Sequence, residues 1–121
     1  MTAAGRRLRI LLVEDEPIIA MTAEDMLDAI GCDVVASAAT LEEALAASGR
    51  GGFDVAMLDI NLNGVASLPV ADALEQGGTP FIFTTGYGVE GCGRHRDVPL
   101  VAKPYRIVDL QAALARATEG R

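Results

Sequence analysis

The chain is poor in several residue types that define whole classes of protein. It has no Trp, only 4% aromatic residues and just two cysteines, Cys32 and Cys92, among 121 residues. These cysteines form neither a metal-ligand spacing nor a disulfide framework. No apolar run approaches the roughly 18 residues of a membrane span, and the run after the basic N-terminal residues is too short for a secretory signal. The sequence therefore predicts a cytoplasmic protein without a membrane partner.

Positive charge is also scarce. The chain has 10 basic residues against 17 acidic ones, a formal net charge of −7, and Lys103 is its single lysine. Because phosphate backbones are bound by clustered Lys and Arg, this balance argues against direct binding of nucleic acid. The length is typical of one domain, residues 1–121, and the high aliphatic content predicts a core with few aromatic rings.

Short apolar runs alternate with stretches of helical periodicity along the chain. Short apolar runs of this kind are typical of buried strands. They predict five strands: Arg9–Val13, Asp33–Ser37, Val55–Leu58, Phe81–Phe83 and Val98–Ala102. Helices are expected from Pro17 to Ile30, after a capping box at Thr40 to about Gly49, from Leu68 to Gln76, and from Pro104 onward. This alternation predicts an α/β fold with an open parallel sheet covered on both faces.

The fourth crossover breaks the alternation. The twelve residues Gly86–Asp97 contain four glycines and show no apolar period. Because an isolated glycine costs about 1 kcal/mol inside a helix, we expect a loop or a single turn here in place of a helix. His95 is expected to lie in solvent within this loop, and Tyr105, further on, is expected to pack against the last helix.

Polar side chains lie just beyond the ends of four of the expected strands. Glu14 and Asp15 follow the first strand, Asp59 the third, Thr85 the fourth and Lys103 the fifth. Parallel strands end at one edge of a sheet, where open α/β sheets bind ligands, so we expect these side chains to lie together. At an effective dielectric constant near 20, each close pair of carboxylates costs on the order of a few kcal/mol. A cation is needed to compensate.

A hard divalent cation, with Mg²⁺ the best fit, provides that compensation. Mg²⁺ prefers carboxylate, carbonyl and water oxygens, and Lys103 supplies a second, fixed positive charge. A carboxylate nucleophile, a metal, a lysine and the Thr85 hydroxyl suit acceptance of a phosphoryl group, which needs mainly positioning and charge neutralisation. The adjacent Thr84 competes for this role, because strand alternation sends only one of the two side chains to the site.

In this order and spacing, the residues resemble the receiver domain of two-component response regulators over nearly the whole chain. The resemblance implies a flavodoxin-like (βα)5 fold with a five-stranded parallel sheet in the order 2-1-3-4-5. It implies that Glu14 and Asp15 hold Mg²⁺, with Asp15 as the direct ligand, and that Asp59 accepts the phosphoryl group. The backbone carbonyl of Asn61 is implied to complete the metal shell.

The same resemblance implies that Thr85 is the switch hydroxyl and that Lys103 contacts the phosphoryl group. The run 83–87 is also similar to a receiver subgroup marked by a Phe-Ala-Thr-Gly-Tyr-like motif and a degenerate fourth helix. The implied phosphoryl donor is a sensor histidine kinase or a histidine phosphotransfer protein. Output is implied through a downstream protein, contacted by strands four and five and the last helix. We thus expect a single-domain response regulator that phosphorylates and dephosphorylates itself. We do not expect a turnover enzyme.

Other functions use similar residues. A degenerate receiver that signals without phosphorylation keeps the fold, but the complete set of acidic residues and Lys103 argues against it. A Mg²⁺-dependent phosphatase with an aspartyl nucleophile, of the haloacid-dehalogenase kind, requires an Asp two positions after the nucleophile, where this chain has Asn61. A flavodoxin-like cofactor binder needs a phosphate-binding loop after strand one, and there Glu14 and Asp15 repel phosphate.

The switch itself is expected to depart from the usual pattern. Receivers usually carry an aromatic residue three positions before the lysine, and here that residue is Leu100. We therefore expect the loop 86–97, with Tyr87, to carry the signal. NMR relaxation should show that the mobility of this loop changes when a phosphoryl mimic is added. A loop that is equally ordered and unmoved in both states contradicts this hypothesis.

Overall fold

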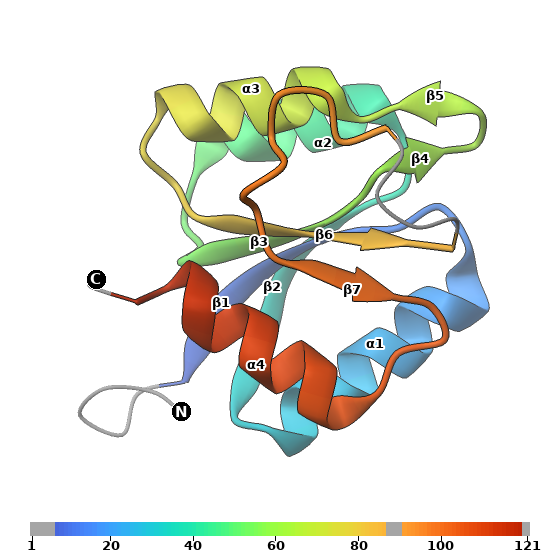
Figure 1. Cartoon of the computed structure of the whole chain (residues 1–121), viewed down its shortest axis with the longest axis vertical. Helices are drawn as coiled ribbons and strands as arrows, with labels where there is room; N and C mark the ends of the chain where they lie inside the picture. Colours follow the sequence, from blue (N-terminus) through green and yellow to red (C-terminus); the bar gives the residue numbers. More distant parts are fainter. Residues whose placement is uncertain (1–6, 87–90, 120–121) are drawn as a thin grey trace.

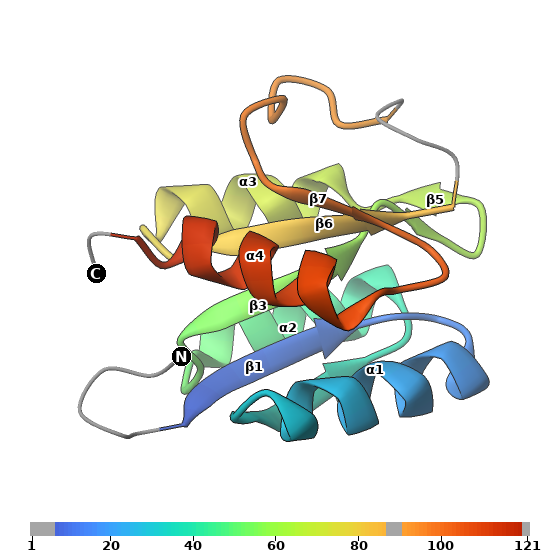
Figure 2. The same cartoon turned by 60° about the horizontal axis from the view of Figure 1, so that its bottom comes forward.

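A computed structural model describes residues 7–86 and 91–119. Its main sheet has five parallel strands in the order β2-β1-β3-β6-β7, which is the predicted order 2-1-3-4-5. The strands are β1 (Leu8–Val13), β2 (Cys32–Ala38), β3 (Val55–Asp59), β6 (Phe81–Thr85) and β7 (Leu100–Ala102). Helices α1 (Pro17–Ala29) and α4 (Ile107–Ala117) cover one face, and α2 (Leu41–Arg50) and α3 (Leu68–Gln76) cover the other (Figures 1 and 2). The predicted fold is confirmed.

The core consists of two apolar layers, one on each face of the sheet. In β1, Leu11 and Val13 pack in the layer under α2 and α3, whereas Ile10 and Leu12 pack in the layer under α1 and α4. Strands buried on both faces read as continuous apolar runs, which is why the sequence revealed them. A shift of one residue would exchange the two layers, so the register of the central strands is strongly fixed.

The helices begin where the sequence predicted, with the exception of α4. The capping box at the start of α2 is present: the Thr40 hydroxyl accepts a hydrogen bond from the Glu43 N–H at 3.1 Å, and the Glu43 carboxylate accepts one from the Ala39 N–H at 2.8 Å. Such a cap satisfies two backbone donors that the helix cannot. In the described ranges, no helix has both the length and the apolar character needed to cross a bilayer.

The segment after Asp59 is a short hairpin. Strands β4 (Asn61–Leu62) and β5 (Val65–Ala66) pair antiparallel. Between them, Asn63 and Gly64 have φ values of 57° and 87°, and two successive positive φ values favour Asn-Gly in a two-residue hairpin turn. The hairpin places Asn61 immediately beyond the end of β3.

The crossover from β6 to β7 contains no helix within its described residues, 91–99. The prediction that His95 lies in solvent is wrong, because its side chain is buried. The imidazole packs edge-on against Phe81 and Phe83, with ring centroids 5.6 and 6.2 Å away, and its Nε2 lies 2.8 Å from Asp72 Oδ1 on α3. His95 thus covers apolar surface of β6 and ties the crossover to α3.

The fifth strand of the sheet is shorter than expected. Pairing with β6 begins at Leu100 instead of Val98. Pro99 has no N–H to donate, although its carbonyl accepts a hydrogen bond from the Phe83 N–H at 2.9 Å. The N–H of Val98 donates to the His95 carbonyl instead. The two residues therefore belong to the crossover.

The last helix begins at Ile107, three residues after the expected start at Pro104. Two features delay it. The Tyr105 side chain is buried against the sheet, and Arg106 has extended backbone angles at the position that precedes the helix. The residues between β7 and α4 thus direct one side chain inward before the helix starts.

The anchoring role of His95 predicts a loss of stability when its ring is removed. We expect His95→Ala to lower the free energy of unfolding by about 2–3 kcal/mol, because it leaves a cavity beside Phe81 and Phe83. Urea denaturation measures this change. Arg96→Ala, at an exposed neighbouring position, is the control and should change stability by less than about 0.5 kcal/mol. Similarly small effects of both substitutions would show that the crossover is not anchored through His95.

Candidate functional site

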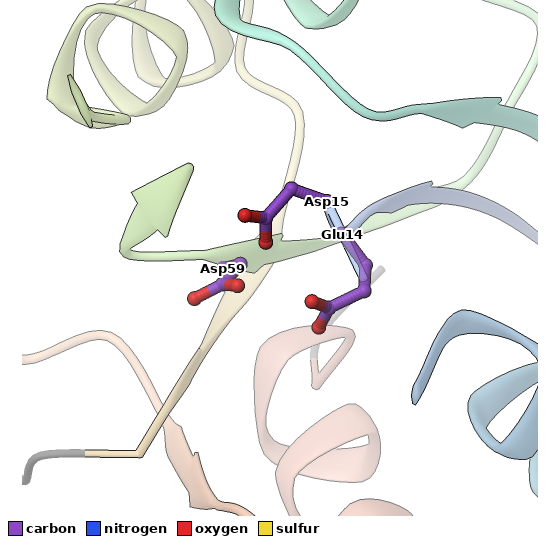
Figure 3. A group of neighbouring side chains, drawn as sticks. All are labelled: Glu14, Asp15 and Asp59. Atoms are coloured by element: carbon purple, nitrogen blue, oxygen red, sulfur yellow. The ribbon is translucent and has the colours of Figure 1, made fainter. Parts of the chain in front are cut away.

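Three acidic side chains meet at the carboxyl ends of β1 and β3. Glu14 and Asp15 follow β1 directly, and Asp59 is the last residue of β3 (Figure 3). One carboxylate oxygen from each lies within 4.8 Å of the others. Glu14 and Asp59 are buried, and Asp15 is half-buried. The parallel pairing of β1 with β3 sets this arrangement, because it aligns the ends of the two strands.

Lys103 lies between two of these carboxylates. Its Nζ is 2.8 Å from Asp59 Oδ2 and 2.9 Å from Glu14 Oε1, and its side chain is only 15% exposed. The Lys103 backbone N–H also donates to the Thr85 carbonyl at 2.8 Å, which ties the residue to the end of β6. A charge removed from water in this way is tolerated only when it is closely paired.

Tyr105 belongs to the same cluster, although the sequence indicated only a packing role. Its hydroxyl donates a hydrogen bond to Glu14 Oε1 at 3.1 Å. Burial raises the pKa of Tyr105 well above its ordinary value, and a hydrogen bond from the Thr84 side chain opposes this shift. The sequence offered only a general indication of this contact, because a tyrosine buried in a core usually finds a hydrogen-bond partner for its hydroxyl.

The two adjacent threonines are both buried at the end of β6. Side chains alternate between the two faces of a strand, so Thr84 lies on the face opposite Phe83 and on the same face as Ile82. That face carries the apolar layer under α1 and α4. There, its side chain reaches Tyr105. Thr85 ends the strand, and its carbonyl holds the backbone of Lys103. Both threonines therefore border Lys103, one through Tyr105 and the other through the backbone.

The backbone around Asp59 is held by two residues that follow it. The Asn61 N–H lies 3.3 Å from Asp59 Oδ1, while the Asn61 side chain accepts a hydrogen bond from the Gly64 N–H in the hairpin turn. The role predicted for Asn61 concerns its backbone carbonyl and not this side chain, and it stays a prediction. Ser67 is fully buried, and its hydroxyl donates to the Asp59 carbonyl at 2.6 Å. Sequence reasoning missed Ser67, which reads as an ordinary residue before α3.

The electrostatics of the cluster show an excess of negative charge. Burial raises the pKa of Asp59 to about 6; the hydrogen bond and charge of Lys103 act against this shift, and the charge of Glu14 adds to it. Burial lowers the pKa of Lys103, but its bonds to Asp59 and Glu14 outweigh that effect, so the pKa is raised overall. Lys103 thus stays charged and offsets only part of three carboxylates. The all-oxygen donor set fits a hard cation such as Mg²⁺.

The comparison with known families agrees with this arrangement. The family model of the response regulator receiver domain matches residues 10–115. The match covers most of the chain, and the chain therefore belongs to the response regulator receiver family. Proteins of this kind are signalling modules of two-component systems and not turnover enzymes.

Individual relatives share both sequence and fold with the chain. The phyllosphere-induced regulator PhyR of Methylorubrum extorquens is 35% identical over 122 residues, which is 95% of this chain but 45% of that protein. The solution structure of SdrG from Sphingomonas melonis Fr1 has a TM-score of 0.81 at 42% identity, covering 95% of this chain and 97% of SdrG. The BeF3-activated conformation of SdrG from Pseudomonas melonis Fr1 has a TM-score of 0.76 at 40% identity and covers 98% and 99%. The chain thus spans less than half of PhyR.

The raised pKa of Asp59 predicts a pH dependence of stability in metal-free protein. An unfolded Asp ionises near pH 4, whereas folded Asp59 keeps its proton until about pH 6. Its contribution to stability is therefore full below pH 4 and falls as the pH rises to 6. We expect the stability of Asp59→Asn relative to wild type to increase by about 2–3 kcal/mol between pH 4 and pH 7.

Urea denaturation in EDTA at a series of pH values measures this difference. Asp25→Asn, at an exposed position on α1, is the matched control and should show no such trend. A relative stability of Asp59→Asn that stays constant or decreases with pH would mean that Lys103 outweighs burial at this site.

Proposed function

We propose that residues 1–121 form one phosphoacceptor domain, which receives a phosphoryl group on Asp59 in a Mg²⁺-dependent reaction. One observation carries this proposal. Asp59 is buried at a strand end, 2.8 Å from the Lys103 ammonium and within 4.8 Å of two further carboxylates. A purely structural aspartate would gain nothing from this crowding, whereas phosphoryl transfer requires a nucleophile surrounded by fixed and metal-borne positive charge.

The metal site would use Asp15 and Asp59 directly, with Glu14 and the Asn61 carbonyl completing it. Mg²⁺ bound there would neutralise charge on the phosphoryl oxygens. Its preference for oxygen ligands matches the acidic group.

The transfer step follows from the chemistry of the nucleophile. A carboxylate oxygen of Asp59 attacks the phosphorus of a phosphohistidine, the P–N bond breaks, and its electron pair returns to the imidazole. The product is an acyl phosphate on Asp59. In this proposal, the Lys103 ammonium moves from the Asp59 carboxylate to a phosphoryl oxygen, and the Thr85 hydroxyl donates to another. Both residues are tied to the end of the same strand, since Lys103 donates to the Thr85 carbonyl.

The proposed donor is a sensor histidine kinase or a histidine phosphotransfer protein, and the proposed output is contact with a downstream protein in the cytoplasm. The BeF3-activated conformation determined for SdrG supports a phosphorylation-dependent state in a similar protein. The face formed by β6, β7 and α4 is the proposed contact surface. At the start of α4, Ile107 and Val108 are exposed apolar residues, which suit such a contact.

Phosphorylation by a small-molecule donor tests the chemistry without knowledge of the kinase. Incubated with acetyl phosphate and Mg²⁺, the wild-type protein should gain one phosphoryl group in its intact mass. Asp59→Asn should gain none, because the amide lacks the nucleophilic oxygen, and EDTA should abolish the gain in wild type. Asp54→Asn, which alters a carboxylate near the opposite end of β3, is the matched control and should leave the gain intact.

Two results would contradict the proposal. The first is a gain of mass by Asp59→Asn equal to that of wild type, which would place the modification elsewhere. The second is the absence of any gain from both acetyl phosphate and a phosphorylated kinase, which would favour a receiver that signals without phosphorylation.

A further inference from the structure

The Glu14 carboxylate is held by three donors, two from the segment between β7 and α4 and one from the backbone just after Glu14 itself. Its Oε1 accepts from Lys103 Nζ at 2.9 Å and from the Tyr105 hydroxyl at 3.1 Å. Its Oε2 accepts from the Glu16 backbone N–H at 3.2 Å. With a side chain that is only 1% exposed, Glu14 depends on these donors instead of water, because a buried anion is stable only when its lone pairs are satisfied.

Among the side chains that donate to Glu14, Tyr105 is the one whose position is fixed by packing in the core. Its ring is buried in the layer under α1 and α4, together with Leu110 and Leu114 of the last helix. The segment between β7 and α4 therefore presents the hydroxyl at a fixed point. The Lys103 side chain, in contrast, is a flexible stem that bonds wherever its carboxylate partners lie.

Glu14 has two competing uses in the acidic cluster. One of its oxygens lies within 4.8 Å of oxygens of Asp15 and Asp59, so the carboxylate borders the site where a cation fits. The same carboxylate is also the second partner of Lys103. Because Oε1 is shared between Lys103 and Tyr105, the tyrosine hydroxyl favours the orientation in which Glu14 faces the lysine.

We infer that Tyr105 is a positioning residue: its hydroxyl holds Glu14 against Lys103 and thereby keeps the ammonium aimed at Asp59. The inference deepens the proposed function and rests on it, because the aligned lysine is the group that meets the phosphoryl oxygens. Thr84 supports the arrangement through its hydrogen bond with the Tyr105 hydroxyl. The hydrogen-bonded chain runs from Thr84 through Tyr105 and Glu14 to Lys103.

The lysine itself provides a readout that needs neither metal nor phosphorylation. Lys103 is the single lysine of the chain, so protein labelled with ¹⁵Nζ-lysine gives one side-chain ammonium signal. In wild type, we expect this signal to be observable, because a paired and largely buried ammonium exchanges its protons slowly. In Tyr105→Phe, which keeps the ring but removes the hydroxyl, the signal should broaden or disappear.

The kinetic readout separates the lysine from the metal. With acetyl phosphate, Tyr105→Phe should lower the maximal phosphorylation rate at saturating Mg²⁺ by about 10-fold, the scale of one lost hydrogen bond to a charged group. The Mg²⁺ dissociation constant, measured by calorimetry, should stay within about twofold of wild type. Thr84→Val should also lower the rate, but by a smaller factor. This variant tests the hydrogen-bonded series of side chains if Tyr105→Phe folds poorly.

The control for these variants is a hydroxyl far from the acidic cluster. Ser48→Ala removes a hydroxyl that bonds within α2, 2.8 Å from the Ala44 carbonyl, and it should leave the rate and the lysine signal unchanged. Wild-type rate and lysine signal in both Tyr105→Phe and Thr84→Val overturn the inference. So does a Tyr105→Phe defect that excess Mg²⁺ restores fully, because Tyr105 would then hold Glu14 for the metal. If wild type itself accepts no phosphoryl group, the proposed function fails, while the lysine signal still reports whether Tyr105 orders Lys103.

Discussion

The structure depends on one constraint: three carboxylates share a sheet edge with a single ammonium group. Glu14 and Asp59 are buried there, and Lys103 bonds to both, at 2.9 and 2.8 Å. One lysine cannot neutralise three acidic groups. Burial raises the pKa of Asp59, and the charge of Glu14 adds to this shift. The site is therefore arranged for additional positive charge. In the proposed function, a metal ion held by these carboxylates would supply that charge, and the lysine would face the phosphoryl oxygens.

The fold creates this constraint through the alignment of its strand ends. Parallel pairing of β1 with β3, and of β3 with β6, brings the carboxyl ends of these strands to one edge. The backbone of Asp59 is held by Ser67 from the start of α3, and the hairpin after β3 turns Asn61 back toward the aspartate. The sheet thus fixes the positions of the carboxylates, while the flexible Lys103 side chain supplies the adjustable contact.

The sequence predicted the sheet and its acidic edge, because both follow from local patterns. Apolar runs buried on both faces reveal the strands, and polar residues directly after them reveal the edge. The burial of His95 and the contact of Tyr105 could not be predicted in this way. His95 lies between two arginines, yet it packs on the apolar surface of β6, which no helix covers in the described part of the crossover. Tyr105 meets Glu14 across 91 positions of sequence, so only the tertiary fold joins them.

The most direct test of the central claim is a crystal structure with Mg²⁺ and a phosphoryl mimic bound. We expect an ion ligated by the Asp15 and Asp59 carboxylates and the Asn61 carbonyl. We also expect the mimic to be attached to Asp59, with Lys103 and Thr85 donating to it. An ion bound at a different part of the surface, or a mimic that leaves the Lys103–Asp59 pair intact, would contradict it.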